Sequence, residues 1–479
     1  MLKVRSWSLR LGKIEKMPNH RNIDAVKIPE KQDANELLAS FIAACDLSAV
    51  DDEGWLSAVR QIADTVVVGW AGSSEDGAYQ TADLALLEDA ASVSRLWGRA
   101  ESVSVSQAVF VNAVSAAALD YDSVHQDSLL YPAAVTAPVA LAMGADVKAS
   151  GEQIVAAHII GAEVMCRISL ATPRQSNWFP ASIYGVFGAT ATAAVLLNLN
   201  VEQTLNALGL ALAQTSGTKQ AIIERALAKR YQTAFAARAG VLSAVLAKRG
   251  VTAAHQFLDG TAGLFSLYEM GTPEKVVAGL ANDFCFQNIT IKRYPTCLCT
   301  HVLIEAMCLL MARYGFNKDD VATVKIRITP YMNRIIGGDY EPKSNPQVAA
   351  QFSAKYATAR ALFSGGVTLS DIGPEQALDP EIISFAQAIE LTLYDNIDGH
   401  VAPCDISVEL KNGQAFSEHV SEVPNAAVGS DALSALGAKA NDCLTRGVLP
   451  MSSHVAQRVF ERLMNMRQAH SLDDLFDES

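Results

Sequence analysis

Through about the first 280 residues, apolar side chains recur at helical spacing, and alanine fills many of these positions. Each such helix has an apolar face that must be buried, and small alanine side chains let helices approach one another closely. A bundle of packed helices satisfies both conditions. The spacing predicts helices at residues 34–45, 55–70, 82–97, 106–119, 154–170, 204–212 and 230–248.

Helix start signals support this interpretation. Ser150 with Gln153 and Asn200 with Gln203 form capping-box patterns, and Pro273 stands at a first helical position. The segment at 154–170 is apolar nearly all round, so we expect a central helix there.

The sequence pattern changes near residue 286. Residues 324–329 alternate apolar and polar side chains as a half-buried strand does, and residues 406–423 form a hairpin pattern around Asn412-Gly413. Helical spacing falls between them at 302–314, 349–362 and 380–388, and returns after Pro424 at 431–444 and 452–466. We therefore predict a mostly α fold: a helical domain built from both chain ends (33–285 and 424–472) with an inserted α+β domain (286–423).

Composition limits the function classes. The net charge of −13 argues against nonspecific nucleic-acid binding, and no uninterrupted apolar run is long enough for a membrane span. Eight scattered cysteines suit a reducing compartment, so we expect a cytoplasmic protein. The alternative is mitochondrial, because residues 1–16 carry five basic side chains among apolar ones, as a transit peptide does.

Chemically capable side chains gather in five stretches. Residues 120–127 carry aspartates and a histidine, which can transfer protons or bind a metal, or can form a solvated helix end. Residues 292–301 carry a lysine, a tyrosine and a histidine between an expected strand and an expected helix, and the spacing of Cys297 and Cys299 is not that of a zinc site. The other three stretches are an aromatic-rich segment at 174–188, the basic pair Lys229-Arg230, and residues 342–356.

Other catalytic motifs are missing. The sequence has no Gly-rich phosphate loop and no G-x-S-x-G nucleophile elbow. The residue types present suit abstraction of a proton next to a carboxylate, with cations stabilising the acid groups and the developing enolate.

Seven short motifs in order make the chain resemble the MmgE/PrpD family, which contains 2-methylcitrate dehydratase, cis-aconitate decarboxylase and iminodisuccinate epimerase. They cover nearly the whole chain from about Leu38 to Met464. The matching residues are Leu119-Asp-Tyr-Asp-Ser-Val-His125, Gly161-x-Glu163-x-x-x-Arg167, Tyr184-Gly-x-Phe-Gly188, Lys229 with Ala236-Ala-Arg-Ala-Gly240, Leu258-Asp-Gly-x-x-Gly-Leu-Phe265, Lys292-x-Tyr-Pro-x-Cys-x-x-x-His301 and Ala350-Gln-Phe-Ser-x-x-Tyr356.

The resemblance implies the same two-domain fold, a homodimer, no metal or organic cofactor, and a site between the domains. On this basis we expect Lys229, Arg230 and Lys292 to hold carboxylates, and His125, His301 or Tyr131 to move protons while Asp122 orients His125. The remaining residues expected to contact the substrate are Phe179, Tyr184, Tyr294 and Ser353.

Two positions depart from many relatives, which have histidines where Tyr131 and Phe179 stand. A tyrosine can still exchange a proton, but a phenylalanine cannot, and it makes its surroundings more apolar. The leading hypothesis is therefore a lyase that dehydrates a 2-alkylcitrate. The alternatives are a cis-aconitate-type decarboxylase, a dicarboxylate epimerase and a catalytically silent family member.

Overall fold

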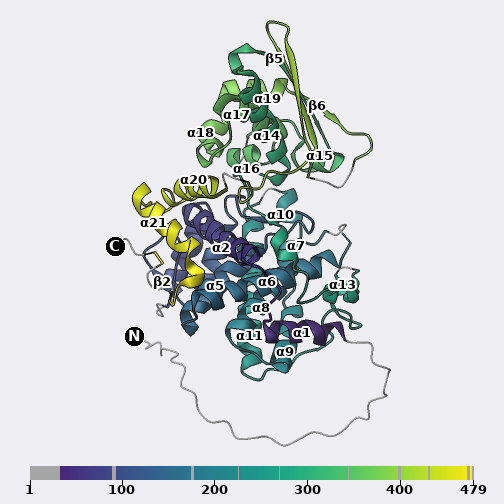
Figure 1. The fold of residues 1–479 in the computed structure, drawn as a ribbon, viewed down its shortest axis with the longest axis vertical. Coiled ribbons are helices and arrows are strands. Elements are labelled where there is room, and N and C mark those ends of the chain that lie inside the picture. Colours follow the sequence, from purple (N-terminus) through teal and green to yellow (C-terminus); the bar gives the residue numbers. More distant parts are fainter. Residues whose placement is uncertain are drawn as a thin grey trace, which may run out of the picture.

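The computed structural model describes residues 33–88, 93–173, 177–224, 226–268, 270–343, 345–397, 401–429, 432–471 and 475–476. The basic segment at 1–16, on which the alternative compartment depends, lies outside these residues. Figure 1 shows a helical part and, at one end of it, a smaller part that contains a sheet. The mostly α fold with an α+β part is therefore confirmed, while the exact domain boundaries stay predictions.

The helical part is built first from the N-terminal half of the chain. Its helices are α1 (Ala34–Ala44), α2 (Asp52–Gly72), α3 (Ala78–Glu88), α4 (Val105–Ala116), α5 (Pro132–Val147), α6 (Gly151–Leu170), α7 (Pro180–Ile183), α8 (Gly185–Leu196), α9 (Val201–Leu212), α10 (Gln220–Ile223), α11 (Ala228–Lys248), α12 (Leu264–Leu267) and α13 (Pro273–Val277). Its short strands are β1 (Ser94–Arg95), β2 (Ser102–Val103), β3 (Val124–His125) and β4 (Ile289–Thr290).

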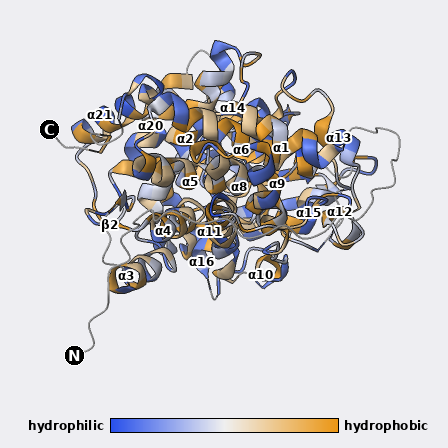
Figure 2. Ribbon diagram, turned by 90° about the horizontal axis from the view of Figure 1, so that it is seen from below, coloured by the Kyte–Doolittle hydropathy of each residue, from blue (hydrophilic) through white to orange (hydrophobic). Residues whose placement is uncertain are grey.

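The centre of the bundle is α8, which contacts α5, α6, α9 and α11 (Figure 2). The helix expected to be central is α6, which begins at the Ser150–Gln153 capping box, packs against α8 and is buried along most of its length. Within the described residues, α6 is also the one helix that is long and apolar enough to cross a membrane. Because most of α6 is buried inside the bundle, its apolar composition is that of a core helix.

The close crossing of α6 and α8 depends on glycine. A Cβ atom at Gly161 would lie 1.9 Å from Thr192 Oγ1 and 2.7 Å from the Gly188 carbonyl oxygen. We expect Gly161→Ala to lower the free energy of unfolding by about 1–3 kcal/mol, since one helix must move. Urea unfolding measures this, with Gly338→Ala as control because nothing lies within 4 Å of that Cβ position. Equal stability of the two variants would contradict this account of the crossing.

The α+β part contains a four-stranded sheet in the order β6-β5-β7-β8, in which β5 is parallel to β6 and antiparallel to β7. The hairpin at Asn412-Gly413 is confirmed, with Gly413 at φ 86°. Helix α14 packs on the sheet and on α17. The elements are α14 (Leu298–Tyr314), β5 (Val321–Ile328), α15 (Pro330–Ile336), α16 (Pro346–Gln351), α17 (Ala354–Ser364), α18 (Pro374–Ala377), α19 (Pro380–Ala388), β6 (Glu390–Leu393), β7 (Cys404–Leu410) and β8 (Ala415–Val420).

The last two helices return to the bundle. Helices α20 (Ala432–Leu444) and α21 (Ser453–Met464) both contact α2, and Figure 1 shows them in yellow beside it. This contact brings residues from the C-terminal end of the chain next to the junction between the two parts.

Two helix predictions were wrong. The helix expected at 82–97 ends at Glu88, and Ser94 and Arg95 instead pair with Val103 and Ser102 as a strand. The single helix expected at 349–362 is divided into α16 and α17, because the Ser353 hydroxyl accepts a hydrogen bond from the Tyr356 N–H and starts a new helix.

Candidate active site

A buried carboxylate, that of Asp120, forms the centre of the site. Asp120 follows α4 and has φ 52°, a left-handed conformation that aspartate tolerates better than most residues. Lys292 Nζ lies 3.1 Å from Asp120 Oδ2 and 2.5 Å from the Asp120 carbonyl oxygen, and Lys229 Nζ donates to Oδ1. Burial alone would raise the pKa of Asp120, but the two ammonium groups outweigh it and hold the pKa well below its usual value.

A two-stranded pairing brings the segments of this centre together. Strand β3 pairs antiparallel with β4, so the chain after Asp120 lies beside the chain that leads into Lys292. Gln126 Nε2 donates to Thr290 Oγ1 at 2.7 Å and fixes the same pairing. Lys292 itself is fully buried, whereas the Lys229 side chain, in the first turn of α11, is 24% exposed. Lys292 therefore holds Asp120 from inside, and Lys229 holds it from the side that is open to a ligand.

The partly buried Tyr131 adds an aromatic ring to this centre. Its ring centroid lies 5.6 Å from Lys229 Nζ and 5.4 Å from Lys292 Nζ, within the range of a cation–π contact. Burial, with the charges of Asp120 and Asp122 added, raises the pKa of the Tyr131 phenol well above its usual value. The hydroxyl therefore stays protonated and can act as a hydrogen-bond donor near neutral pH.

A cavity of about 360 Å³ opens beside Asp120, at the junction of the bundle with the α+β part. Its charged lining consists of Asp120, Lys229 and Arg230 from the bundle and Arg334 from α15. Three cations against one carboxylate give this end an excess positive charge, which suits a ligand with several carboxylates. The uncharged lining residues, mostly apolar, are Ala117, Ala118, Ala221, Ile222, Ile223, Ala226, Leu227, Ile335, Val348, Gln351 and Phe352.

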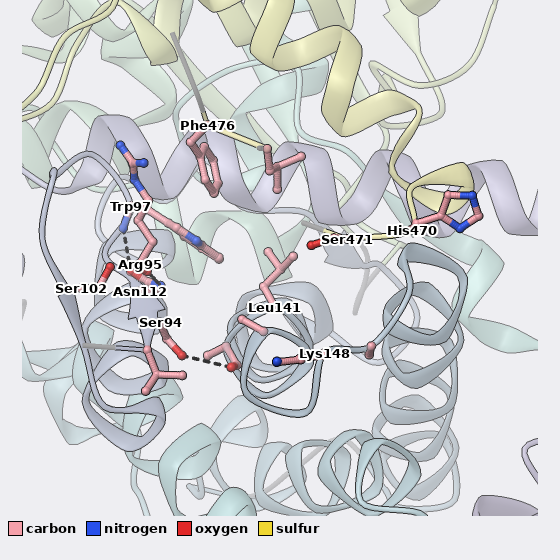
Figure 3. Close-up of a pocket in the computed structure, with 16 residues that line it drawn as sticks. Ser94, Arg95, Trp97, Ser102, Asn112, Leu141, Lys148, His470, Ser471 and Phe476 are labelled. Atoms are coloured by element: carbon pink, nitrogen blue, oxygen red, sulfur yellow. Dashed lines mark hydrogen bonds between the residues drawn. The ribbon is translucent and has the colours of Figure 1, made fainter. Parts of the chain in front are cut away.

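A larger cavity of about 490 Å³ shares no lining residue with this one (Figure 3). It is lined by Arg95, which lies beside the Phe476 ring, and by Lys148 and His470, and its wall comes from α5, the β1–β2 ribbon and the C-terminal end of the chain. Neither lysine of the Asp120 centre reaches it, so we place the candidate active site in the smaller cavity.

Comparisons with known proteins agree with the motifs. The MmgE/PrpD N-terminal domain model matches residues 36–276, and the MmgE/PrpD C-terminal domain model matches residues 294–464. The chain belongs to the MmgE/PrpD family. Its relatives include the cis-aconitate decarboxylase of Homo sapiens, which is 25% identical over 404 residues, 80% of this chain and 82% of the relative.

Two fungal relatives of this MmgE/PrpD protein are similarly distant. A cis-aconitate decarboxylase-like protein oryM of Aspergillus oryzae is 27% identical over 65% of this chain and 70% of its own length. A cis-aconitate decarboxylase of Aspergillus terreus is 24% identical over 75% and 79%. All three relatives carry the name cis-aconitate decarboxylase or cis-aconitate decarboxylase-like protein, and decarboxylases are lyases. These names support an enzyme of the lyase type.

Some of the MmgE/PrpD residues predicted from sequence meet at the cavity. Lys229 and Arg230 line it, and Lys292 and Tyr131 lie directly behind Asp120. The Arg230 guanidinium donates to the Asp76 carbonyl, which fixes its position at the wall. The structure therefore brings these cations together around Asp120, and their roles in substrate binding stay predictions.

The two predicted histidines are buried away from the cavity lining. His125 Nδ1 lies 2.9 Å from Ser128 Oγ and Nε2 lies 3.1 Å from the Cys285 carbonyl oxygen. His301, on α14, packs against the edge of the Tyr294 ring at 5.2 Å, and neither of its ring nitrogens has a hydrogen-bond partner in the described structure. Burial, and after it the positive charge of Lys292, lowers the pKa of His301 to about 3. The His301 ring is therefore neutral near pH 7, and no imidazolium is present there to donate a proton.

Four of the predicted substrate contacts serve the fold. Tyr184 lies within hydrogen-bond distance of Thr172 Oγ1, at 2.9 Å, and Phe179 is a core residue that precedes α7. The Tyr294 hydroxyl donates to Glu305 Oε2 at 2.9 Å, and Ser353 caps α17. None of these four lines the cavity, so the loss of a histidine at 179 changes the core behind the site rather than the cavity wall.

Three site residues were missed at the sequence level. The sequence predicts a site role for Asp122 and none for Asp120, although both lie in the same Asp-Tyr-Asp motif. Gln351 donates to the Leu119 carbonyl at 2.6 Å, and Arg334 reaches the cavity from a helix with no catalytic motif. The Asp-Tyr-Asp motif signalled Asp120, and the Gln351-Phe-Ser motif signalled Gln351, but nothing in the sequence pointed to Arg334.

Buried histidines predict an acid-sensitive fold. The pKa values of His158 and His301 are both lowered to about 3, chiefly by burial, so between pH 6.5 and 3 the unfolded chain binds protons that the folded one does not. The pKa of Asp122, raised by burial to about 6, opposes this between about pH 6 and its usual value of 3.8. From pH 7 to 5 these groups together should lower the free energy of unfolding by about 2–3 kcal/mol.

Urea unfolding of His301→Asn at both pH values tests this dependence. Removing one histidine should reduce the loss between pH 7 and 5 by about 2 kcal/mol. His454→Gln, at an exposed position on α21, is the matched control and should leave the loss unchanged. A wild-type stability that does not fall between these pH values would contradict the expectation.

Proposed function

We propose that this protein is a lyase acting on a citrate- or aconitate-like polycarboxylate, and that its reaction is the dehydration of a 2-alkylcitrate. The observation that carries the proposal is the cavity beside Asp120, in which Lys229, Arg230 and Arg334 face a mostly apolar wall. The cations match the carboxylates of such a substrate, and Ile222, Ile335 and the other apolar residues match an alkyl chain.

The proposed chemistry separates substrate binding from proton transfer. Lys229, Arg230 and Arg334 hold the carboxylates and stabilise the negative charge that develops when a proton leaves the adjacent carbon. Asp122 lies two residues beyond Asp120 and does not itself line the cavity, so it takes that proton through an intervening water; burial raises its pKa to about 6, which suits a base near neutral pH.

The Tyr131 phenol gives its proton to the departing hydroxyl group as the carbon–oxygen bond breaks, and water leaves. The neighbouring Lys229 and Lys292 ammonium groups stabilise the phenolate until the proton held by Asp122 returns to it.

Decarboxylation of a cis-aconitate-like acid is the second candidate. The names of the relatives favour it, and the same cations would stabilise the charge left behind when CO2 departs. Tyr131 weighs against this candidate, because the family resemblance implies a histidine there in decarboxylases, whereas Phe179 lies in the core and does not decide between the two reactions.

A substrate panel distinguishes the two reactions. Purified protein is incubated with citrate, 2-methylcitrate, longer 2-alkylcitrates and cis-aconitate, while the absorbance of unsaturated acids and the release of CO2 are recorded together. We expect unsaturated product from an alkylcitrate without CO2. CO2 from cis-aconitate alone would replace the proposal with its alternative, and no product from any of these acids would reject both.

Arg334 provides the test of carboxylate binding from the α+β side. Arg334→Gln removes one of the three cavity cations, so we expect KM to rise about 10- to 100-fold, as the loss of a charged hydrogen bond worth about 1.5–3 kcal/mol predicts. Arg327→Gln on the exposed surface of β5, where Arg327 pairs with Asp405, is the matched control. An unchanged KM in Arg334→Gln would show that this side chain does not bind the substrate.

A further inference from the structure

A third lysine lies behind the Asp120 centre and comes from the C-terminal end of the chain. Lys439, on α20, donates from Nζ to the Tyr121 carbonyl and to the Lys292 carbonyl, both at 3.0 Å. The same ammonium lies 3.7 Å from the centroid of the Tyr121 ring. Its side chain is 4% exposed and lines neither of the two cavities described above.

The counter-charge of Lys439 is Asp64 on α2. Asp64 Oδ1 lies 2.6 Å from Lys439 Nζ, and the Asp64 side chain is fully buried. An ammonium group has three N–H donors, and the backbone carbonyls use two of them. The Asp64 carboxylate lies at ion-pair distance from the ammonium without a hydrogen bond of normal geometry, and burial raises its pKa against the opposing charge of Lys439. A fully buried ion pair is costly to desolvate, so a gain in stability alone does not account for this one.

The two carbonyls belong to the two segments that form the site. Tyr121 directly follows Asp120, and Lys292 is the residue whose own ammonium binds Asp120. A second contact between these segments runs from the Tyr121 hydroxyl to the Arg293 carbonyl at 3.1 Å. Lys439 therefore joins the backbones on both sides of the Asp120–Lys292 contact, and Asp64 fixes the position of Lys439.

We propose that the buried Lys439–Asp64 pair is a positioning device, which sets the distance between Lys292 and Asp120 without touching the substrate. The inference rests on the proposed function in so far as Asp120 and its lysines form the active site. It makes the C-terminal helix α20 a functional part of a site whose cavity is lined by residues from 117 to 352.

The matched test replaces the pair as a unit. Lys439→Met and Asp64→Asn are made singly and together, because removing one partner leaves an uncompensated buried group while removing both does not. The control is Arg360→Met, which breaks the largely buried Arg360–Asp371 pair (2.7 Å) between α17 and η3 (Leu369–Ile372), neither residue of which lines the cavity. Thermal unfolding, kcat and KM are measured for each variant with whichever acid the wild-type protein converts.

We expect the double variant to unfold at a higher temperature than either single variant and still to lose about 10²-fold in kcat, as a misplacement of about 1 Å does. KM should change far less, because the cavity cations are untouched. The control should lose stability and keep its kcat. A double variant with wild-type kcat would mean that the pair serves only the fold, and the proposal would be wrong.

Crystal structures of the wild-type protein and the double variant test the inference without any substrate. The 3.1 Å contact between Lys292 Nζ and Asp120 Oδ2 should lengthen beyond about 4 Å in the variant. An unchanged contact would overturn the inference. If the wild-type protein converts none of the acids, the proposed function fails, and this comparison still decides the role of Lys439.

Discussion

Asp120→Asn should abolish nearly all activity and also destabilise the protein. Asn keeps the size of the side chain but removes the negative charge between Lys229 and Lys292, and Lys292 is fully buried. An uncompensated buried charge costs about 3–5 kcal/mol, which urea unfolding at pH 7 measures. The loss in kcat should reach about 10³-fold, since the Lys229 ammonium at the cavity loses its fixed position.

Asp405→Asn is the control for this variant. Asp405 also pairs with a cation, Arg327 at 2.5 Å, but on the surface of the sheet, where such pairs contribute about 0–1 kcal/mol. If Asp120→Asn kept wild-type stability and kcat, the carboxylate would not be the centre of the site, and the arrangement of the two lysines would need another explanation.

Lys229→Met should separate activity from stability. The Lys229 side chain is 24% exposed and lines the cavity, so its loss removes a substrate contact while Lys292 continues to neutralise Asp120. We expect kcat/KM to fall about 10³-fold, equivalent to about 4 kcal/mol of transition-state stabilisation, with a much smaller loss of folding stability than in Asp120→Asn.

The control for this second variant lies on the same helix. Lys248→Met changes an exposed lysine at the other end of α11, where Nζ donates to the Leu197 carbonyl. Wild-type kcat/KM in Lys229→Met would remove Lys229 from the mechanism. A collapse of stability in that variant as large as the loss in Asp120→Asn would show that Lys229 serves the fold instead.

Much of the fold could be predicted because local signals and burial agree. The Ser150–Gln153 capping box begins α6, and the hairpin follows the Asn412-Gly413 turn. The parallel pairing of β6 with β5 could not be predicted, because β6 is largely exposed and its residues show no alternation of burial. The break at Ser353 was missed since the apolar spacing continues through it.

The site was predictable as a collection of residue types, but less so as geometry. Lys229, Arg230 and Lys292 were found because basic side chains stand out in motifs of a chain with few charges. The choice between Asp120 and Asp122 depends on the left-handed turn at 120, which aims that carboxylate at the lysines. Lys439 contributes through contacts with residues more than a hundred positions away, and no local pattern encodes them.

A crystal structure with tricarballylate, an unreactive tricarboxylate, tests the central claim most directly. We predict carboxylates bound by Lys229, Arg230 and Arg334 in the cavity beside Asp120, with the carbon chain toward Ile222 and Ile335. The contrary result is a cavity left empty at saturating ligand while the tricarboxylate binds elsewhere, for example beside Arg95 and Lys148 in the larger cavity. That outcome would move the active site and overturn the proposed function.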